Sequence, residues 1–373
     1  MNCVVGHHNS FFIKRKDNGK QKIVKGQIIV LTPELSYTGA PESVLNMVDI
    51  LIKMGYFVTV VSFSKGEKEV EFYGKGVEVV YLEKEEFKTS SFAIWIKNYR
   101  LCIANTSMLA AQAVIIQKYI PTLLIIREAK SIMEFQQIFQ TRIEDIKKVK
   151  EVYCVSKYAQ REIEHQIGVK PQILYNYVPD RYSKRKERKG ARVKFAIIGT
   201  IEERKGVDVC IKAFIRLKNQ FDNCELHIVG RTLEWQRSYW EPLMTKIKEK
   251  DAIFYHGEIQ NRDKLIQFYE EVDVVIVASR DESCSLVALE AAMMGKVLIV
   301  SQNVGAQYLV KFINGFIFQT GNVEHLVVGM KKYVKTYWLN KIRGKVSRYL
   351  YKKHASQKYY FKQLKKVIEG YIE

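Results

Sequence analysis

The stretch FAIIGTIEERKGVDV, residues 195–209, decides the fold, because an apolar run ends there at a glycine and a helical pattern follows. Residues 195–198 have the apolar, β-branched character of a buried strand, and the residues after Gly206 have helical spacing. A strand, a glycine turn and a helix in this order are typical of parallel α/β domains. Arg204 and Lys205 lie in the turn between the two elements. Two cations at this position of the fold raise the question of which ligand they bind.

Short apolar runs alternate with helical segments along the whole chain. The runs of the first half are QIIVL, YFVTVVSF, VEVVYL, LCIAN, PTLLII and EVYCVS, and those of the second half are VKFAIIG, CELHIVG, AIFYHG, VDVVIVAS, KVLIVS and GFIFQ. Continuous apolar strands indicate parallel sheets that helices cover on both faces. The sequence thus predicts an α/β protein with two Rossmann-like domains that face each other across a cleft.

The length and composition agree with two folded domains. The chain has 373 residues, more than one ordinary core contains, and 47% of them are hydrophobic. The boundaries that we expect are a basic N-terminal extension at 1–25, a first domain at 26–180, a basic linker at 181–192, a second domain at 193–345 and a C-terminal helix at 346–373.

The net charge of +20 is concentrated in two basic clusters. One is RYSKRKERKGARVK at 181–194, and the other runs from Lys331 to Lys366 with thirteen Lys or Arg and no acid. Such clusters favour a polyanion or a negatively charged membrane, although solvated helix faces and a linker are the plainer interpretation. Aromatic residues are interleaved with the cations of the second cluster, as at membrane interfaces. We therefore predict peripheral binding to the inner face of the cell membrane.

Other features argue against a membrane-spanning or secreted protein. The apolar stretch 101–126 is interrupted by polar residues and Pro121, so we expect no transmembrane helix. Residues 1–16 lack the pattern of a secretion signal. The six cysteines show no C-x-x-C spacing, which suits reduced cytosolic thiols better than disulfides or zinc. A cytoplasmic location is the prediction.

The candidate anion site lies at the strand ends, where ligands bind in this class of fold. Gly199 allows close backbone approach, and the N-terminus of the following helix offers N–H groups. Arg204 and Lys205 add positive charge for a phosphate or diphosphate. The plainer interpretation is that both are ordinary surface cations of a loop.

A second group of candidates lies in SRDESCSLVALEAAMMGK, residues 279–296. Its helix is apolar almost all round except at Glu290, and a buried carboxylate needs partners such as sugar hydroxyls. Glu282 lies eight residues earlier, so both carboxylates are expected to face the cleft. Alternatively, Glu282 is a first-turn acid favoured by the helix dipole, and Glu290 pairs with a core arginine. The backbone N–H groups expected to point at phosphate are those of Ser285, Leu286 and Val287.

With these motifs the sequence resembles the retaining GT-B glycosyltransferases of group 1, which include many bacterial surface-polysaccharide enzymes. The resemblance covers residues 27 to about 370. It is densest from 195 to 318, where GTIEERKG, GEIQNRDKLIQFYEEVDVVIVAS, ESCSLVALEAAMMGK, NVGA and NGFIF follow the family's order and spacing. It implies a GT-B fold with an N-terminal acceptor domain, a C-terminal nucleotide-sugar donor domain and a C-terminal helix that crosses back to the first domain.

The resemblance also implies roles for individual residues. Arg204 and Lys205 bind the donor diphosphate, Glu290 binds the ribose, and Glu282 binds the donor sugar. The catalytic set is then Glu282, Arg204, Lys205 and Arg127. The other positions expected to contact the donor are Gly39, Ala40, Gly199, Thr200, Gly230, Ile259, Ser285, Leu286 and Val287.

Two positions depart from the family pattern. Many members have an arginine where this chain has Thr200, and here Arg204 stands beside the lysine instead, as in a common variant of the family. Many members have a histidine, usually thought to contact the sugar, at the end of the strand in PTLLIIREA, where this chain has Arg127 followed by Glu128. We expect Arg127 either to hold phosphate or acceptor, or to pair with Glu128 or another acid.

Transfer from a nucleotide sugar leaves negative charge on a diphosphate, which the enzyme must stabilise. The chain has no D-x-D pair, and two cations with a helix N-terminus are a metal-free substitute. We therefore expect no metal and no cofactor beyond the nucleotide-sugar co-substrate.

The predicted function is transfer of a hexose from a UDP- or GDP-sugar to a saccharide or lipid-linked saccharide in capsule, exopolysaccharide or O-antigen synthesis. Retention of configuration rests on the resemblance alone. One alternative is a GT-B-like nucleotide-sugar epimerase. The other is a basic nucleic-acid-binding protein, against which Glu282 and Glu290 in the predicted cleft argue.

Overall fold

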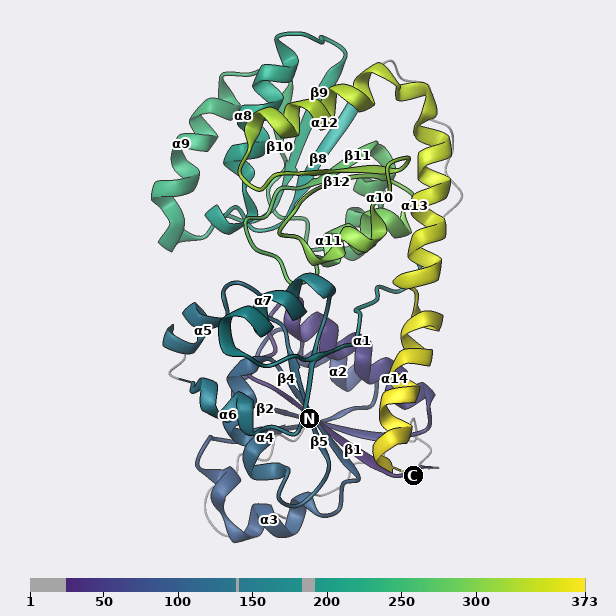
Figure 1. Cartoon of the computed structure of the whole chain (residues 1–373). Helices are drawn as coiled ribbons and strands as arrows, with labels where there is room; N and C mark the ends of the chain where they lie inside the picture. The colour runs from purple at the N-terminus through teal and green to yellow at the C-terminus, as the bar shows by residue number, and fades with distance from the viewer. Residues whose placement is uncertain (1–24, 139–140, 183–191, 373) are drawn as a thin grey trace. The chain divides into compact units, whose positions relative to one another are not determined.

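The computed structural model describes residues 25–372 except 139–140 and 183–191. It divides into two compact units (Figure 1). Unit 1 comprises the described residues of Met1–Leu174 and of Phe361–Glu373, and unit 2 comprises those of Tyr175–Tyr360. The predicted extension at 1–25, apart from Lys25, and most of the predicted linker at 181–192 lie outside the described residues.

Unit 1 is built on a seven-stranded sheet with the order β3-β2-β1-β4-β5-β6-β7, in which all the pairs are parallel. The order reverses between β1 and β4, which is the position where ligands bind in open α/β sheets. The strands are β1 (Gln27–Thr32), β2 (Phe57–Ser62), β3 (Glu78–Tyr81), β4 (Leu101–Asn105), β5 (Thr122–Ile126), β6 (Glu151–Cys154) and β7 (Gln172–Ile173).

The helices of unit 1 connect these strands and cover their apolar side chains. Strands β4 and β5 are buried along their whole length, as continuous apolar runs predict. The helices are α1 (Gly39–Lys53), α2 (Glu69–Gly74), α3 (Ser90–Ile96), α4 (Ala110–Ile116), α5 (Ile132–Ile138), α6 (Ile143–Lys148) and α7 (Lys157–Ile167), with the part of α14 (Gln357–Ile372) from Phe361 onward.

Unit 2 repeats this plan with a six-stranded parallel sheet in the order β10-β9-β8-β11-β12-β13. The order again reverses next to its first strand, between β8 and β11. The strands are β8 (Val193–Ile198), β9 (Cys224–Val229), β10 (Ile253–Tyr255), β11 (Val274–Val277), β12 (Val297–Ser301) and β13 (Gly315–Phe318). The helices are α8 (Val207–Lys218), α9 (Arg237–Lys248), α10 (Arg262–Glu271), α11 (Leu286–Met293), α12 (Val323–Lys335) and α13 (Asn340–His354).

The predicted fold class is confirmed, because each predicted apolar run contains a strand and both sheets are parallel. The unit boundaries differ from the predicted domain boundaries. The segment after Leu174 belongs to unit 2, since Tyr351 donates a hydrogen bond of 2.8 Å to the carbonyl of Val178 and Tyr177 packs on Tyr360. In the predicted C-terminal helix at 346–373, the end of α13 and the start of α14 are separated at Ala355–Ser356.

Candidate active site

Glycines shape the turn that carries the two predicted phosphate-binding cations. Gly206 has a φ of 67° at the start of α8, and a Cβ there would lie 2.2 Å from the carbonyl oxygen of Ala278. At Gly230 a Cβ would lie 1.8 Å from the carbonyl oxygen of Gly199. The chain can therefore bring the ends of β8, β9 and β11 together only because these positions lack side chains. Arg204 and Lys205 occupy the short 3-10 turn Glu203–Lys205 that follows β8.

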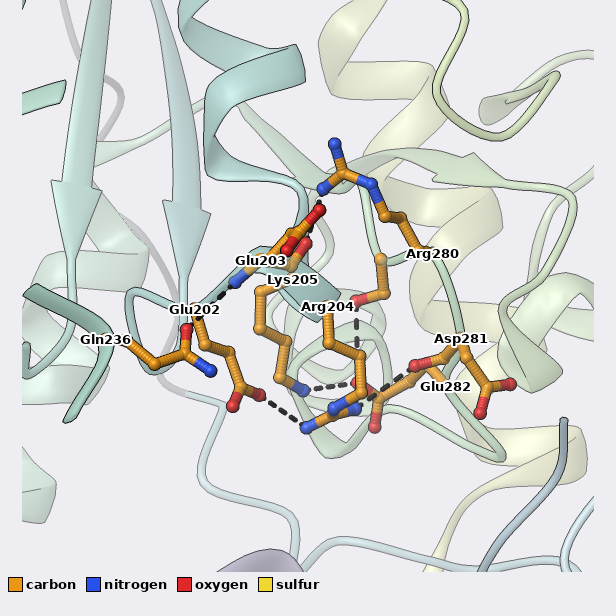
Figure 2. Close-up of polar contacts among 9 residues, drawn as sticks. Glu202, Glu203, Arg204, Lys205, Gln236, Arg280, Asp281 and Glu282 are labelled. Carbon is orange, nitrogen blue, oxygen red and sulfur yellow. Dashed lines mark hydrogen bonds and ion pairs between the residues drawn. The ribbon is translucent and has the colours of Figure 1, made fainter. Parts of the chain in front are cut away.

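Three of the four predicted catalytic residues meet in one hydrogen-bonded cluster (Figure 2). Lys205 Nζ donates a short hydrogen bond to the carboxylate of Glu282, and Arg204 Nη1 lies 3.4 Å from the same oxygen. Arg204 also donates to Glu202 at 2.6 Å and to the carbonyl of Asp281 at 3.1 Å. The structure thus brings Arg204, Lys205 and Glu282 together. In this arrangement both cations contact the carboxylate of Glu282.

The cluster sets the charge state of Glu282. Its side chain is 16% exposed, and burial alone raises the pKa of a carboxyl group. Lys205 and Arg204 outweigh that effect and lower the pKa of Glu282 below its ordinary value. Glu282 is therefore ionised at neutral pH and neutralises part of the positive charge of the turn. The ammonium group of Lys205 has three N–H donors, and Glu282 occupies one of them.

A small cavity adjoins Lys205 at the ends of β8 and β11. Its volume is about 10 Å³, room for roughly one water molecule. Its lining includes Gly199, Ser279, Ser285 and Val287, together with Lys205. Residues from both predicted motifs therefore line the same cavity.

Arg280, which sequence reasoning missed, ties the two loops of the cluster together. Its guanidinium donates two hydrogen bonds of 3.0 Å to the carboxylate of Asp208 and a short one to the carbonyl of Glu203. Its backbone N–H donates to the carbonyl of Arg204 at 2.7 Å. Tyr239 donates a further hydrogen bond to Asp208 at 2.9 Å. In the sequence, only the positions of these residues point to a role at the site. Asp208 lies two residues after Gly206, and Arg280 lies two residues before Glu282.

Ser285 begins α11 with an unusual backbone conformation. Its φ is 79°, a region that non-glycine residues rarely adopt, and its hydroxyl accepts a hydrogen bond of 3.3 Å from the N–H of Ala288. The preceding loop is held by backbone hydrogen bonds from Glu282 to Asn303 and from Gly305 to Glu282. Leu286 and Val287 form the first turn of α11, where helix N–H groups lack intrahelical acceptors.

Glu290 lies on α11 and is held by two side chains of α10. One carboxylate oxygen accepts a short hydrogen bond from Arg262, and the other accepts one of 2.9 Å from the buried hydroxyl of Tyr269. The side chain of Glu290 is 6% exposed, whereas that of Arg262 is 32% exposed. The arginine pairing that the alternative interpretation expected is therefore present, with an arginine at the edge of the core. The ribose-binding role of Glu290 stays a prediction.

The predicted residues of the first domain lie in unit 1. Arg127 follows β5, and its Nε donates a hydrogen bond of 2.7 Å to the side-chain oxygen of Asn105 at the end of β4. The buried carboxylate of Glu128 accepts hydrogen bonds from the backbone N–H groups of Arg127 and Ser107. Burial raises the pKa of Glu128. Gly39 and Ala40 begin α1.

The remaining predicted positions lie on the loops of unit 2. Thr200 follows Gly199, and the half-buried Ile259 lies in the loop after β10. Sequence reasoning missed the nearby pair of His227 and His256, whose ring nitrogens are 3.0 Å apart. Burial is the largest cause that lowers the pKa of His227 to about 4.

Possible metal ligands and membrane-spanning helices concern here the part of the chain that the structure describes. Within it, no three His, Cys, Asp or Glu residues lie together in a way that could hold a metal ion. Within the same residues, no helix is both long enough and apolar enough to cross a membrane. The five described cysteines are buried free thiols, and Cys3 lies outside the described residues.

Two parallel-sheet units, the second carrying a cation turn and an acidic loop, agree with the GT-B class of fold that the sequence predicts. Residues 179–353 match the family described as glycosyl transferases group 1, and residues 25–171 match glycosyl-transferase family 4. The chain is therefore similar to glycosyltransferase families in two separate regions, each of which is less than half of its length.

Curated relatives match only part of the chain. An uncharacterized glycosyltransferase of Methanocaldococcus jannaschii is 27% identical over 136 residues, which are 36% of this chain and 34% of that protein. The lipopolysaccharide 1,2-N-acetylglucosaminetransferase of Salmonella typhimurium is 29% identical over 126 residues, 32% of each chain. The matched regions thus span about a third of these relatives' lengths.

Solved structures match nearly the whole chain and show the fold. HepE of Anabaena in complex with UDP has a TM-score of 0.79 at 16% identity, with 92% of this chain and 100% of that chain covered. Sucrose-phosphate synthase of Thermosynechococcus elongatus has a TM-score of 0.75 at 16% identity, with 93% and 99% covered. The GT-B fold predicted from the sequence is therefore confirmed.

Proposed function

We propose that the protein transfers a sugar from a nucleoside-diphosphate sugar to an acceptor, with the donor diphosphate bound at the turn of Arg204 and Lys205. The observation that carries the proposal is the cluster of these two cations around Glu282 at the carboxyl end of a parallel sheet. An arginine and a lysine held in place before a ligand binds are what a diphosphate leaving group needs.

The chemistry follows from an exchange of partners. When the diphosphate binds, its oxygens replace the Glu282 carboxylate as acceptors for Lys205 and Arg204. Glu282 is then available to accept hydrogen bonds from hydroxyls of the donor sugar. The bond between the anomeric carbon and the diphosphate oxygen breaks, and its electron pair moves to the diphosphate. The acceptor hydroxyl bonds to the carbon and passes its proton to the departing diphosphate.

The finer features of the proposal rest on the family resemblance and on the named relatives. HepE was solved with UDP, so UDP-sugars are the first donors to test. A lipopolysaccharide glycosyltransferase among the relatives supports a saccharide or lipid-linked saccharide acceptor of the cell surface. We propose a hexosyl transfer that retains configuration, requires no metal, and takes place at the inner face of the cell membrane.

The test is turnover of a panel of UDP- and GDP-sugars by the purified protein, followed as nucleoside diphosphate release. The expected result is release from at least one donor that persists in EDTA and yields a sugar of unchanged anomeric configuration by NMR. Conversion of a donor into its epimer would support the epimerase instead. No release from any donor, with or without candidate saccharides, would contradict the proposal.

A further inference from the structure

One face of α13 combines lysines with apolar side chains. Its exposed residues recur with helical spacing, so they lie on one side of the helix. The residues of this surface, called the α13 basic face, are Lys341, Ile342, Lys345, Tyr349, Lys352 and Lys353. Tyr349 is 59% and Ile342 51% exposed. No acid occurs between Lys331 and Lys366, so the helix itself provides no opposite charge.

Helix α13 runs along an edge of unit 2 (Figure 1), and its buried face is fixed there while the residues of the basic face are exposed. At Gly344 a Cβ would lie 2.4 Å from the carbonyl oxygen of Gly295, at the end of α11. Arg348 donates a hydrogen bond of 2.9 Å to the carbonyl of Met293. The buried hydroxyl of Tyr351 donates to Val178 at 2.8 Å. The lysines therefore project from a rigid element of unit 2.

Further apolar side chains lie next to the N-terminal end of this helix. Trp338, two residues before α13, is 75% exposed, and Phe312 is 89% exposed. The loop that carries Phe312 is tied to α13 by a buried hydrogen bond of 2.9 Å from Asn314 to Ser347. It is tied to α12 by Lys332, which donates to the carbonyl of Phe312 at 2.8 Å. Trp338 thus lies three and four residues before Lys341 and Ile342, whereas the loop of Phe312 contacts the buried face of α13.

We propose that the α13 basic face, with Trp338, docks unit 2 on an anionic lipid surface. The lysines attract the headgroups, and the apolar side chains gain free energy when they leave water at the interface. A nucleic acid also attracts lysines, but its phosphate backbone offers the aliphatic side chain of Ile342 no comparable apolar phase. This inference rests on the membrane location in the proposed function but not on the chemistry at Lys205. Loss of vesicle binding and loss of nucleoside diphosphate release are therefore distinguishable outcomes.

The structure also separates this surface from the rest of the basic segment. Tyr333 and Tyr351 are fully buried and Tyr360 is 3% exposed, so they belong to the core. Arg343 is buried and donates hydrogen bonds to Thr336 and Asn340. These residues are therefore not part of the docking surface, and variants that remove them would test folding instead.

The test is co-sedimentation of the full-length protein with phosphatidylcholine vesicles that contain phosphatidylglycerol, and with vesicles of phosphatidylcholine alone. One variant replaces Lys341, Lys345, Lys352 and Lys353 with Gln. A matched control replaces four other exposed lysines of unit 2 with Gln, namely Lys246, Lys248, Lys250 and Lys264. Both variants lose the same net charge, and melting curves verify that both are folded.

We expect the wild type and the control to sediment with anionic vesicles at low salt and to be released at high salt. Each α13 lysine should contribute about fivefold to partitioning, so the α13 variant should bind on the order of a hundredfold or more weakly. Anionic vesicles should also shift the fluorescence of the wild type to the blue, an effect that Trp338→Phe removes and Trp235→Phe leaves in place.

Three outcomes would overturn the proposal. The first is equal binding of the wild type to neutral and anionic vesicles. The second is equal loss of binding in the α13 variant and the control. The third is tight, salt-sensitive binding of duplex DNA or RNA that requires the α13 lysines while vesicles are not bound, which would identify the face as a nucleic-acid surface.

Discussion

Replacement of Lys205 by alanine should lower turnover about a hundredfold while the fold is retained. Its ammonium group is held in advance by Glu282, and its side chain is only 23% exposed. A preorganised donor at a developing phosphate charge is worth about 3 kcal/mol, which corresponds to about two orders of magnitude in rate. The assay is the initial rate of nucleoside diphosphate release from the preferred donor at saturating concentration.

The same substitution should also lower stability by about 1–3 kcal/mol, because Glu282 loses the nearer of its two cationic partners and keeps only Arg204. Adding Glu282→Gln removes the charge of this partly compensated carboxylate, so the double variant should regain part of the stability without regaining turnover. Lys218→Ala is the matched control, since this lysine of α8 is half-buried and donates to a backbone carbonyl. Turnover of Lys205→Ala within about fivefold of the wild type would refute the phosphate-binding role, since the lost interaction should cost far more.

Three further predictions follow from the remaining contacts. Glu290→Gln should weaken the affinity for UDP about tenfold in calorimetry, because a charged hydrogen-bond acceptor becomes neutral. Unchanged affinity with a lower melting temperature would show that Glu290 serves only the structural contacts with Arg262 and Tyr269. The folded protein lowers the pKa of His227 to about 4 from the ordinary 6.5, so the unfolded chain is protonated first as pH falls. The free energy of unfolding should therefore fall by about 2 kcal/mol from pH 7 to pH 5 in urea titrations, and an equal slope in His227→Gln would contradict this cause. Arg280→Ala should reduce kcat/KM about tenfold, because the turn that carries Arg204 is no longer tied to Asp208. Arg280→Lys should restore only part of the lost kcat/KM, because lysine cannot donate two parallel hydrogen bonds to the Asp208 carboxylate. Full activity of Arg280→Ala would exclude a positioning role for Arg280.

The strands and the cation turn could be predicted because their signals are local. Each buried strand is a continuous apolar run, and Gly199 and Gly206 mark a turn whose conformation other residues cannot adopt. The partners of Arg204, Lys205 and Glu290 could not be predicted in the same way. Glu290 meets Arg262 and Tyr269 only because α10 packs beside α11, and Lys205 meets Glu282 across 77 residues of sequence.

The basic segment at the C-terminal end shows the same limit. Composition predicted a mixture of cations and aromatic residues, but not which of them are exposed. Tyr333 and Tyr351 enter the core, whereas Trp338 and Tyr349 face solvent. On α13, Gly344 packs closely against the backbone of Gly295, which follows α11, and the local sequence pattern does not predict this contact.

Calorimetric titration of UDP and GDP tests most directly whether the Arg204–Lys205 turn is a diphosphate site. The wild type should bind one of the two at a single site, and an Arg204→Ala, Lys205→Ala double variant should bind it at least about a hundredfold more weakly. The matching nucleoside, which lacks phosphates, should bind both proteins equally weakly. Undiminished binding by the double variant, or no saturable binding of either nucleotide by the wild type, would contradict the account.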